Sequence, residues 1–218
     1  MKKLKRPAPP ACLAQLMATS CHWDQVKPEH RVEIWNSLDV MQNRFCAYCE
    51  CLLNRKHIEH FKTQNKHSQL IFAWDNLFGS CGDTTKTGGW AHCGIYKDHY
   101  AGSYDPNHLL KPDVDNPSDF LLFLVGGTVR EQDNLAPADK IKALETIRVL
   151  NLNDSSSLVG RRKQAIKNQQ AQIEALYELK QELPENDWKQ LLQEELNELQ
   201  YAEFSTALVH AWQFNKQY

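Results

Sequence analysis

Apolar residues recur at helical spacing in four segments of the chain, and all four lie outside its cysteine-rich middle. Apolar side chains three or four residues apart lie on one face of a helix, so this spacing predicts four amphipathic helices. The helices are expected at 28–43, 137–153, 158–183 and 188–214. The last two are predicted to form an antiparallel hairpin that packs through Ile166, Ile173, Leu176, Leu192, Leu196 and Leu199.

Outside these helices the chain alternates between loop-like and strand-like stretches. Residues 120–131, FLLFLVGGTVRE, are typical of a strand that bends at its two glycines, and a loop rich in proline, aspartate and asparagine precedes them at 103–119. Residues 45–104 are dense in cysteine, histidine, glycine and aromatic residues, and short strands with one helix after Cys93 are predicted there. The first eleven residues form an extended, proline-rich arm that either frays or docks on a partner.

The composition is that of an ordinary globular protein, with 42% hydrophobic and 24% charged residues in a chain of 218. No apolar run approaches the roughly 20 residues of a membrane-spanning helix. Basic residues open the chain, but Pro-Ala-Pro-Pro follows at 7–10, where a signal peptide has its apolar core. We therefore expect a cytoplasmic protein, in which cysteines bind metals more often than they form disulfides.

The net charge is only −2, but the two halves of the chain differ in sign. Residues 1–100 hold 13 Lys and Arg against 9 Asp and Glu, whereas residues 101–218 hold 12 against 18. The cysteine-rich half is therefore basic, which suits a polyanionic ligand, although the excess is far below that of a dedicated nucleic-acid-binding domain. A nucleic acid would need a partner subunit to stay bound.

Two pairs of cysteines predict a structural zinc site. Cys46 and Cys49 form a CxxC knuckle, whose tight turn directs both sulfurs to one tetrahedral ion. Cys81 and Cys93 supply a second, more widely spaced pair, and a four-thiolate site would staple the two segments together. Buried cysteines without a metal are the alternative. Two further residues could replace a member of the wider pair, namely Cys51 or His92.

Between the cysteine pairs lie Glu59 and His60, adjacent in the sequence, and then Asn76. A carboxylate is a hard oxygen ligand for Mg²⁺ or a similar ion, and an imidazole accepts a proton from water near neutral pH. Hydrolysis of a phosphodiester uses both, because a cation neutralises charge on the phosphate while a base generates hydroxide. The Glu-His pair therefore indicates phosphodiester chemistry.

Four elements of the sequence, in this order, resemble the HNH (ββα-metal) endonucleases. They are Cys46-x-Tyr48-Cys49-Glu50, Ile58-Glu59-His60-Phe61, Trp74-x-Asn76-Leu77-Phe78-x-Ser80-Cys81 and Cys93-Gly94-x-x-Lys97. More narrowly, they resemble the HNH subunit, PtuB, of Septu-type and retron-associated anti-phage systems. The resemblance implies an α+β fold with a small zinc-stapled ββα-metal core at 44–104. An N-terminal arm and short helix for partner docking at 1–43, and a mainly helical extension at 105–218, would complete the chain.

The resemblance also implies roles for particular residues. His60 is the general base, Glu59 is a ligand of the catalytic Mg²⁺ or similar divalent ion, and Asn76 orients the loop and His60. The family usually has His or Asn directly after the last knuckle cysteine as a second ligand, where this chain has Gly94. Asp98 lies one helical turn further along the same face and is the expected replacement. Two other residues are in reserve for this role, His99 and His92.

The function implied by the resemblance is a metal-dependent endonuclease that hydrolyses DNA, tRNA or other RNA. It would be the effector subunit of a complex with an ABC-type ATPase (PtuA-like) and, in retron systems, a reverse transcriptase with its RNA–DNA hybrid. The alternative is a catalytically inactive, zinc-binding interaction module, which Gly94 favours. A sequence-specific restriction enzyme is a third possibility, disfavoured by the low positive charge and the lack of a separate DNA-reading domain.

Several basic and aromatic residues allow two interpretations each. Lys97 either contacts a phosphate or is a solvated helix lysine. Arg161, Arg162 and Lys163 lie where a helix should begin, a place that the helix dipole makes unfavourable for cations. They point either to an anionic partner or to an ordinary solvated basic turn. Trp90 either stacks on a base or supports its own glycine-rich loop.

Overall fold

The computed structural model describes residues 1–19, 22–85 and 88–214, which together form an α+β protein. These residues contain seven α-helices and two small antiparallel sheets of two strands each. The helices are α1 (Ala11–Thr19), α2 (Pro28–Gln42), α3 (Cys93–His99), α4 (Pro137–Val149), α5 (Leu158–Leu179), α6 (Glu185–Leu199) and α7 (Ser205–Phe214). The strands are β1 (Lys56–His60), β2 (Leu77–Cys81), β3 (Leu121–Phe123) and β4 (Val129–Glu131). The predicted α+β class is confirmed.

Within the described ranges no helix is both long enough and apolar enough to cross a membrane.

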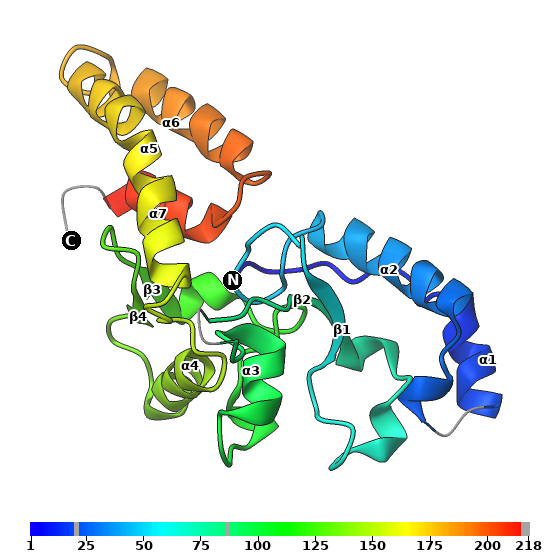
Figure 1. Cartoon of the computed structure of the whole chain (residues 1–218). Helices are drawn as coiled ribbons and strands as arrows, with labels where there is room; N and C mark the ends of the chain where they lie inside the picture. The colour runs from blue at the N-terminus through cyan, green and yellow to red at the C-terminus, as the bar shows by residue number, and fades with distance from the viewer. Residues whose placement is uncertain (20–21, 86–87, 215–218) are drawn as a thin grey trace.

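The ribbon formed by β1 and β2 lies at the centre of the molecule, and α3 packs along it (Figure 1). The antiparallel register pairs Cys81 with Lys56 at one end of the ribbon and Leu77 with His60 at the other. At the start of α3, the backbone N–H of Gly94 donates to Ser80 Oγ at 3.1 Å, next to Cys81. The start of α3 therefore lies at the end of the ribbon that carries Cys81, and His60 lies at the opposite end of the ribbon.

The predicted helix starts at Pro28, Pro137 and Leu158 are found in the structure. Proline suits the first helical position because its fixed φ matches the helix and its missing N–H is not needed there. The single helix predicted for 188–214 is wrong, since α6 and α7 occupy that range. The helix is interrupted at Phe204, which has a left-handed φ of 57° and donates its backbone N–H to Glu50 O at 3.1 Å. A tertiary contact therefore overrides the continuous helical pattern.

The strand predicted at 120–131 is a hairpin of two short strands, β3 and β4, rather than one bent strand. Its turn contains Gly127 with a φ of 89°, a conformation that residues with a side chain rarely adopt. A Cβ atom at this position would lie 2.2 Å from the carbonyl oxygen of Val159. Gly127 therefore provides both the turn and the close packing against α5.

The N-terminal arm, residues 1–10, is extended and packs against its own chain. Met1 is buried, and its amino group pairs with Glu50. Arg6 forms an ion pair with Asp113 at 2.7 Å and donates to Trp74 O at 2.6 Å. Fraying, one of the two alternatives stated for this arm, is therefore wrong, and docking of the arm on a partner stays a prediction. Helix α1, which follows the arm, was not predicted.

Helices α5 and α6 form the predicted hairpin, whose outer end projects from the rest of the molecule (Figure 1). Trp188 on α6 donates its Nε1–H to Leu176 O on α5 at 2.8 Å. Of the six packing residues predicted, Ile166, Ile173, Leu176 and Leu199 are buried, and Leu192 and Leu196 are half-buried against the core. Helix α7 then returns beside α5 and β3.

Candidate active site and metal centre

The four predicted zinc ligands meet at one end of the ribbon. The sulfur atoms of Cys46, Cys49, Cys81 and Cys93 all lie within 4.8 Å of one another, and all four residues are buried. The knuckle turn is closed by backbone hydrogen bonds from Glu50 N to Cys46 O at 3.1 Å and from Cys46 N to Cys51 O at 2.8 Å. The cluster fits a structural zinc ion in donor type, number and separation.

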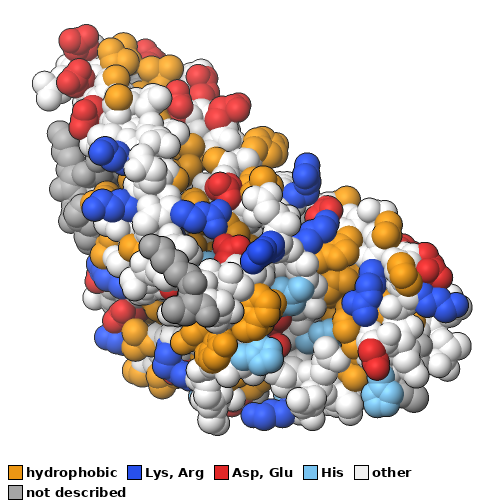
Figure 2. All heavy atoms as spheres, in the orientation of Figure 1, with side chains coloured by type: hydrophobic (Ala, Val, Ile, Leu, Met, Phe, Trp, Pro, Cys, Tyr) orange, Lys and Arg blue, Asp and Glu red, His pale blue; other side chains and the backbone are white. Residues whose placement is uncertain are grey.

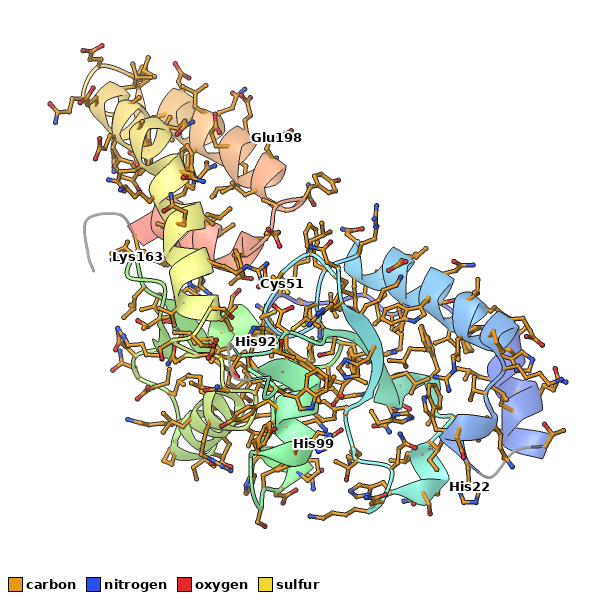
Figure 3. The ribbon with its side chains drawn as sticks, viewed as in Figure 1. His22, Cys51, His92, His99, Lys163 and Glu198 are labelled. Atoms are coloured by element: carbon orange, nitrogen blue, oxygen red, sulfur yellow. The ribbon has the colours of Figure 1, made fainter. Side chains whose placement is uncertain are left out.

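Both residues proposed as substitutes lie beside this cluster. The sulfur of Cys51 is 3.2 Å from that of Cys49, and His92 Nδ1 is 3.1 Å from the sulfur of Cys93. Figure 3 shows Cys51 and His92 near the N-terminal end of α3, with His99 at the opposite end. The cluster therefore holds more potential ligands than a single tetrahedral ion uses. Of the seven cysteines, Cys21 lies outside the described residues.

Further along β1, Glu59 is buried between a histidine and a lysine. Its Oε2 lies 3.1 Å from Nε2 of His57, and its Oε1 lies 2.9 Å from Nζ of Lys97. The contact with Lys97 is an ion pair without hydrogen-bond geometry, since Oε1 has no hydrogen-bond partner among the described residues. One oxygen of a buried carboxylate is thus stabilised by charge alone.

Lys97 is a buried lysine that lies between two carboxylates. Only 2% of the residue is exposed, and its Nζ donates to Asp98 Oδ1 at 2.5 Å, to His60 O at 3.2 Å and to the Tyr104 hydroxyl at 3.3 Å. Its ammonium also contacts Glu59, so it lies between the two carboxylates that are predicted to bind the catalytic cation. The interpretation of Lys97 as a solvated helix lysine is wrong.

The charges at this end depend on one another. Burial acts to raise the pKa of Glu59, but the Lys97 ammonium and His57 outweigh it and hold that pKa below its ordinary value. Burial, and then repulsion from Glu59, raise the pKa of Asp98. Burial acts to lower the pKa of Lys97, but the two carboxylates raise it above the ordinary value. Glu59 is therefore ionised near neutral pH and Lys97 is charged.

His60 lies one residue further along β1, where the alternation of a strand directs it away from Glu59. Its Nε2 lies 3.0 Å from Ile71 O, and its Nδ1 lies 3.2 Å from Nε2 of Gln64. A carbonyl only accepts, so Nε2 carries the proton and Nδ1 is the basic nitrogen. Burial lowers the pKa of His60, which keeps the ring neutral at neutral pH. The ring also packs edge-on against Trp23, with centroids 4.6 Å apart.

His60 borders a cavity of about 510 Å³ beside the carboxylates. Lys66, Lys97, Asp98 and His99 also line this cavity. His99 is exposed at the end of α3, whereas His92 is buried at the sulfur cluster. Of the two reserve ligands, His99 therefore lies at the cavity and His92 lies at the cysteines.

Asn76 ties together the loop that surrounds His60. Its Oδ1 accepts from Lys62 N at 2.7 Å, and its Nδ2 donates to Lys62 O at 3.0 Å and Leu70 O at 3.1 Å. Lys62 follows His60 by two residues, and Leu70 precedes Ile71, whose carbonyl contacts the ring of His60. The buried amide thus fixes both sides of this loop.

Gly94 occupies the position where the sequence resemblance leads us to expect a second ligand. A Cβ atom there would lie 2.2 Å from Oε2 of Glu59, so the carboxylate occupies the space of the missing side chain. His57, which was not considered from the sequence, lies two residues before Glu59 on β1 and contacts it. Residues two apart on a strand share one face, and this spacing is the signal that could have identified His57.

The donors at this end are of the kind that a divalent cation binds. Oε1 of Glu59 is a buried oxygen without a hydrogen-bond partner, and Asp98 adds a partly exposed carboxylate. Oxygen donors of this type suit Mg²⁺ or a similar ion. The ammonium of Lys97 lies against the same two carboxylates, so a cation would compete with it for them.

Comparison with known proteins agrees with the sequence motifs. No protein-family model matches the chain. Over 169 residues it is 26% identical to Septu protein PtuB of Bacillus thuringiensis, an alignment that covers 73% of this chain. The chain is a distant homologue of Septu protein PtuB. The resemblance to PtuB is therefore confirmed, and the matched region covers 57% of that relative's length.

Proposed function

We propose that this protein is an HNH endonuclease that hydrolyses phosphodiester bonds of DNA, tRNA or other RNA with a divalent cation. The order of β1, β2 and α3, with a cysteine cluster at one end, supports a zinc-stapled ββα-metal core at 44–104. The arm and first helices at 1–43 and the helical extension at 105–218 surround it. The cysteine cluster would hold a structural Zn²⁺, and Glu59 and Asp98 would hold catalytic Mg²⁺ or a similar ion.

The observation that carries the proposal is a cavity lined by the neutral imidazole of His60 and by Asp98, with the buried, ionised carboxylate of Glu59 held behind it by Lys97. His60 is neutral, so its Nδ1 can accept a proton from water, while Nε2–H is fixed by Ile71 O. Glu59 and Asp98 supply negative charge for a cation. A bound cation would neutralise charge on the phosphate and its leaving group. Asn76 would hold the loop that positions His60.

The similarity to Septu protein PtuB supports a role in anti-phage defence with an ABC-type ATPase (PtuA-like). In retron-linked systems a reverse transcriptase and its RNA–DNA hybrid would join the complex. Figure 2 shows acidic side chains gathered at the outer end of the α5–α6 hairpin and basic ones over the body. A polyanion would therefore bind at the body, and the hairpin is free for a protein partner.

The test is a cleavage assay on plasmid, single-stranded DNA and tRNA in the presence of the ATPase partner. A positioned general base contributes about 10²- to 10⁴-fold to a rate. His60→Ala should lose at least the lower of these factors, and a thermal melt should show that the variant is still folded although it loses the packing of the buried ring against Trp23. His108→Ala, which changes an exposed histidine, is the matched control. Equal cleavage by wild type and His60→Ala would remove the catalytic assignment.

A catalytically inactive zinc-binding module is the second candidate, and two observations favour it. Gly94 provides no ligand, and the ammonium of Lys97 already forms ion pairs with both Glu59 and Asp98. This candidate predicts that the purified chain binds zinc and that wild type cleaves none of the three substrates with the partner present. Cleavage that depends on His60 would reject it.

A further inference from the structure

The cysteine cluster has a second group of potential ligands that shares one residue with the first. The ligand atoms of Cys51, Cys81 and Asp83 all lie within 4.8 Å of one another. Cys81 belongs to both groups, Cys51 is buried, and the side chain of Asp83 is 27% exposed. Two thiolates and a carboxylate are ligands that zinc accepts.

The sulfur of Cys51 lies directly beside the sulfurs of the first site. In a tetrahedral zinc site with bonds of about 2.3 Å, two sulfurs on the same ion lie about 3.8 Å apart. The sulfurs of Cys49 and Cys81 are 3.7 Å apart, and that of Cys51 is 3.2 Å from Cys49. Cys51 therefore lies against the same sulfurs that the first ion would use.

A buried histidine provides an independent observation at this place. The Nε2 of His92 has no hydrogen-bond partner among the described residues, although the residue is 1% exposed. This nitrogen lies 3.6 Å from Oδ2 of Asp83, beyond hydrogen-bond distance. Unpaired polar atoms are rare in protein interiors and call for an explanation. An ion held by Asp83 would give the nitrogen a partner.

We propose that the cluster binds a second zinc ion through Cys51, Cys81 and Asp83, with Cys81 bridging the two ions. The buried His92 lies beside this site, with its Nε2 3.6 Å from Oδ2 of Asp83. The first ion would keep Cys46, Cys49, Cys81 and Cys93. The site is separate from the carboxylate pair at the other end of the ribbon.

The charges around the cluster agree with this assignment. Five thiolates and the carboxylate of Asp83 would bring six negative charges, and two zinc ions would neutralise four of them. Arg161 contacts Asp83 at 3.0 Å, and the buried Arg162 lies within electrostatic range of Cys49. The two arginines at the start of α5 therefore match the charge that remains. Arg162 is buried and is therefore not the solvated residue that the ordinary interpretation of this turn assumed, whereas Arg161 is partly exposed and Lys163 is exposed.

The competing explanation is that Cys51 binds no metal and only contacts the sulfur of Cys49. The contact of 3.2 Å between the two sulfurs allows this. The protein would then bind one zinc ion, and Asp83 would serve only as the partner of Arg161. The two explanations differ in the number of zinc ions per chain.

The experiment measures zinc in the full chain, purified without chelators, by elemental analysis and by native mass spectrometry. Wild type should hold two zinc ions, and Cys51→Ser and Asp83→Asn should each hold one. Cys12→Ser, which changes a buried free cysteine on α1, should keep two. One zinc ion in wild type would overturn the proposal, as would two ions retained in both variants.

Zinc-edge X-ray absorption of wild type and Asp83→Asn tests the second site even if the Cys51 variant does not fold. Asp83 is partly exposed, so this substitution is not expected to unfold the chain. Wild type should show a zinc–zinc distance and an oxygen or nitrogen shell, and the zinc–zinc distance should disappear in the variant. A purely sulfur shell in wild type would contradict the second site. Neither measurement uses cleavage, so the second zinc site and the proposed nuclease activity are tested independently.

Discussion

The two ends of the ribbon carry different chemistry and differ in how they are completed. The sulfur end, Cys46, Cys49, Cys81 and Cys93, brings four thiols together, and the imidazole of His92 lies beside them. The carboxylate end, Glu59 and Asp98, has the ammonium of Lys97 between its donors. The first end needs an external ion, whereas the second end has a cation of its own.

The difference shows what each kind of donor requires of a fold. Buried thiols are tolerated as small apolar groups until a metal ionises them. A buried carboxylate is costly at once unless a positive charge lies beside it. Lys97 fulfils that requirement, and a divalent ion would do the same. The carboxylate end can therefore be completed in two ways, which is the basis of the predictions below.

The largest effect is expected from Cys46→Ala at the sulfur end. The binding free energy of a structural zinc is largely folding free energy, about 10–16 kcal/mol in isolated zinc-finger peptides. The variant should lose its zinc, its solubility and most of its cooperative unfolding transition. Zinc content and a thermal melt check this, with Cys12→Ser as the control. A soluble, folded Cys46→Ala protein would show that zinc does not staple this end.

At the carboxylate end, Lys97→Met should have the next largest effect. Removing one partner from a buried ion pair costs roughly 3–5 kcal/mol, because the other charge is left uncompensated. The variant should be destabilised by about this amount in denaturant, and Mn²⁺ should restore more stability to it than to wild type. Mn²⁺ would then replace the missing ammonium.

The control for this experiment is Lys56→Met, which breaks an exposed pair with Asp39. Exposed pairs contribute about 0–1 kcal/mol, so this variant should stay close to wild type with and without Mn²⁺. If Lys97→Met is destabilised but does not respond to Mn²⁺, the carboxylate end is not a cation site. That result would favour the catalytically inactive module.

The sulfur end was predictable from sequence because residue type and spacing specify it. A CxxC knuckle fixes two ligands locally, and Cys81 and Cys93 flank one loop. Helix starts at Pro28 and Pro137 were predictable for a similar reason, since proline acts within its own turn. In each case the information is local.

The carboxylate end was only partly predictable because its arrangement depends on tertiary packing. Glu59 and His60 could be identified by chemistry, but Lys97 looks like a surface residue until β1 is placed against α3. The break at Phe204 depends in the same way on Glu50, far away in the sequence. Helix α1 was missed because the prolines before it suggested that the extended arm continues.

A third prediction concerns Gly94, which lies where a second metal ligand was expected. Gly94→Ala places a methyl group where Glu59 now lies, so the carboxylate must move away from Lys97 or His57. Overpacking of a core costs about 1–3 kcal/mol. The variant should be destabilised by this amount, and its response to Mn²⁺ should differ from wild type.

Gly82→Ala is the matched control, because a Cβ at Gly82 has its nearest neighbour at 3.6 Å, an ordinary contact. Gly94→Ala should be clearly less stable than Gly82→Ala in a thermal melt. Equal stability of the two variants would show that Glu59 can leave its place without cost. The placement of Glu59 would then not explain why this chain has glycine rather than a metal ligand at position 94.

The smallest effect on stability is expected from substitution of His57, whose ring contacts Oε2 of Glu59. A typical hydrogen bond contributes about 0.5–1.5 kcal/mol to stability, so His57→Ala should cost about that much. His57→Gln can still donate to the carboxylate and should recover most of the loss, as denaturant unfolding would show. If His57 also supports the cation site, the response of His57→Ala to Mn²⁺ should fall below that of His57→Gln. Equal responses would limit His57 to a structural role and leave Glu59 and Asp98 as the groups that decide whether this end binds a metal.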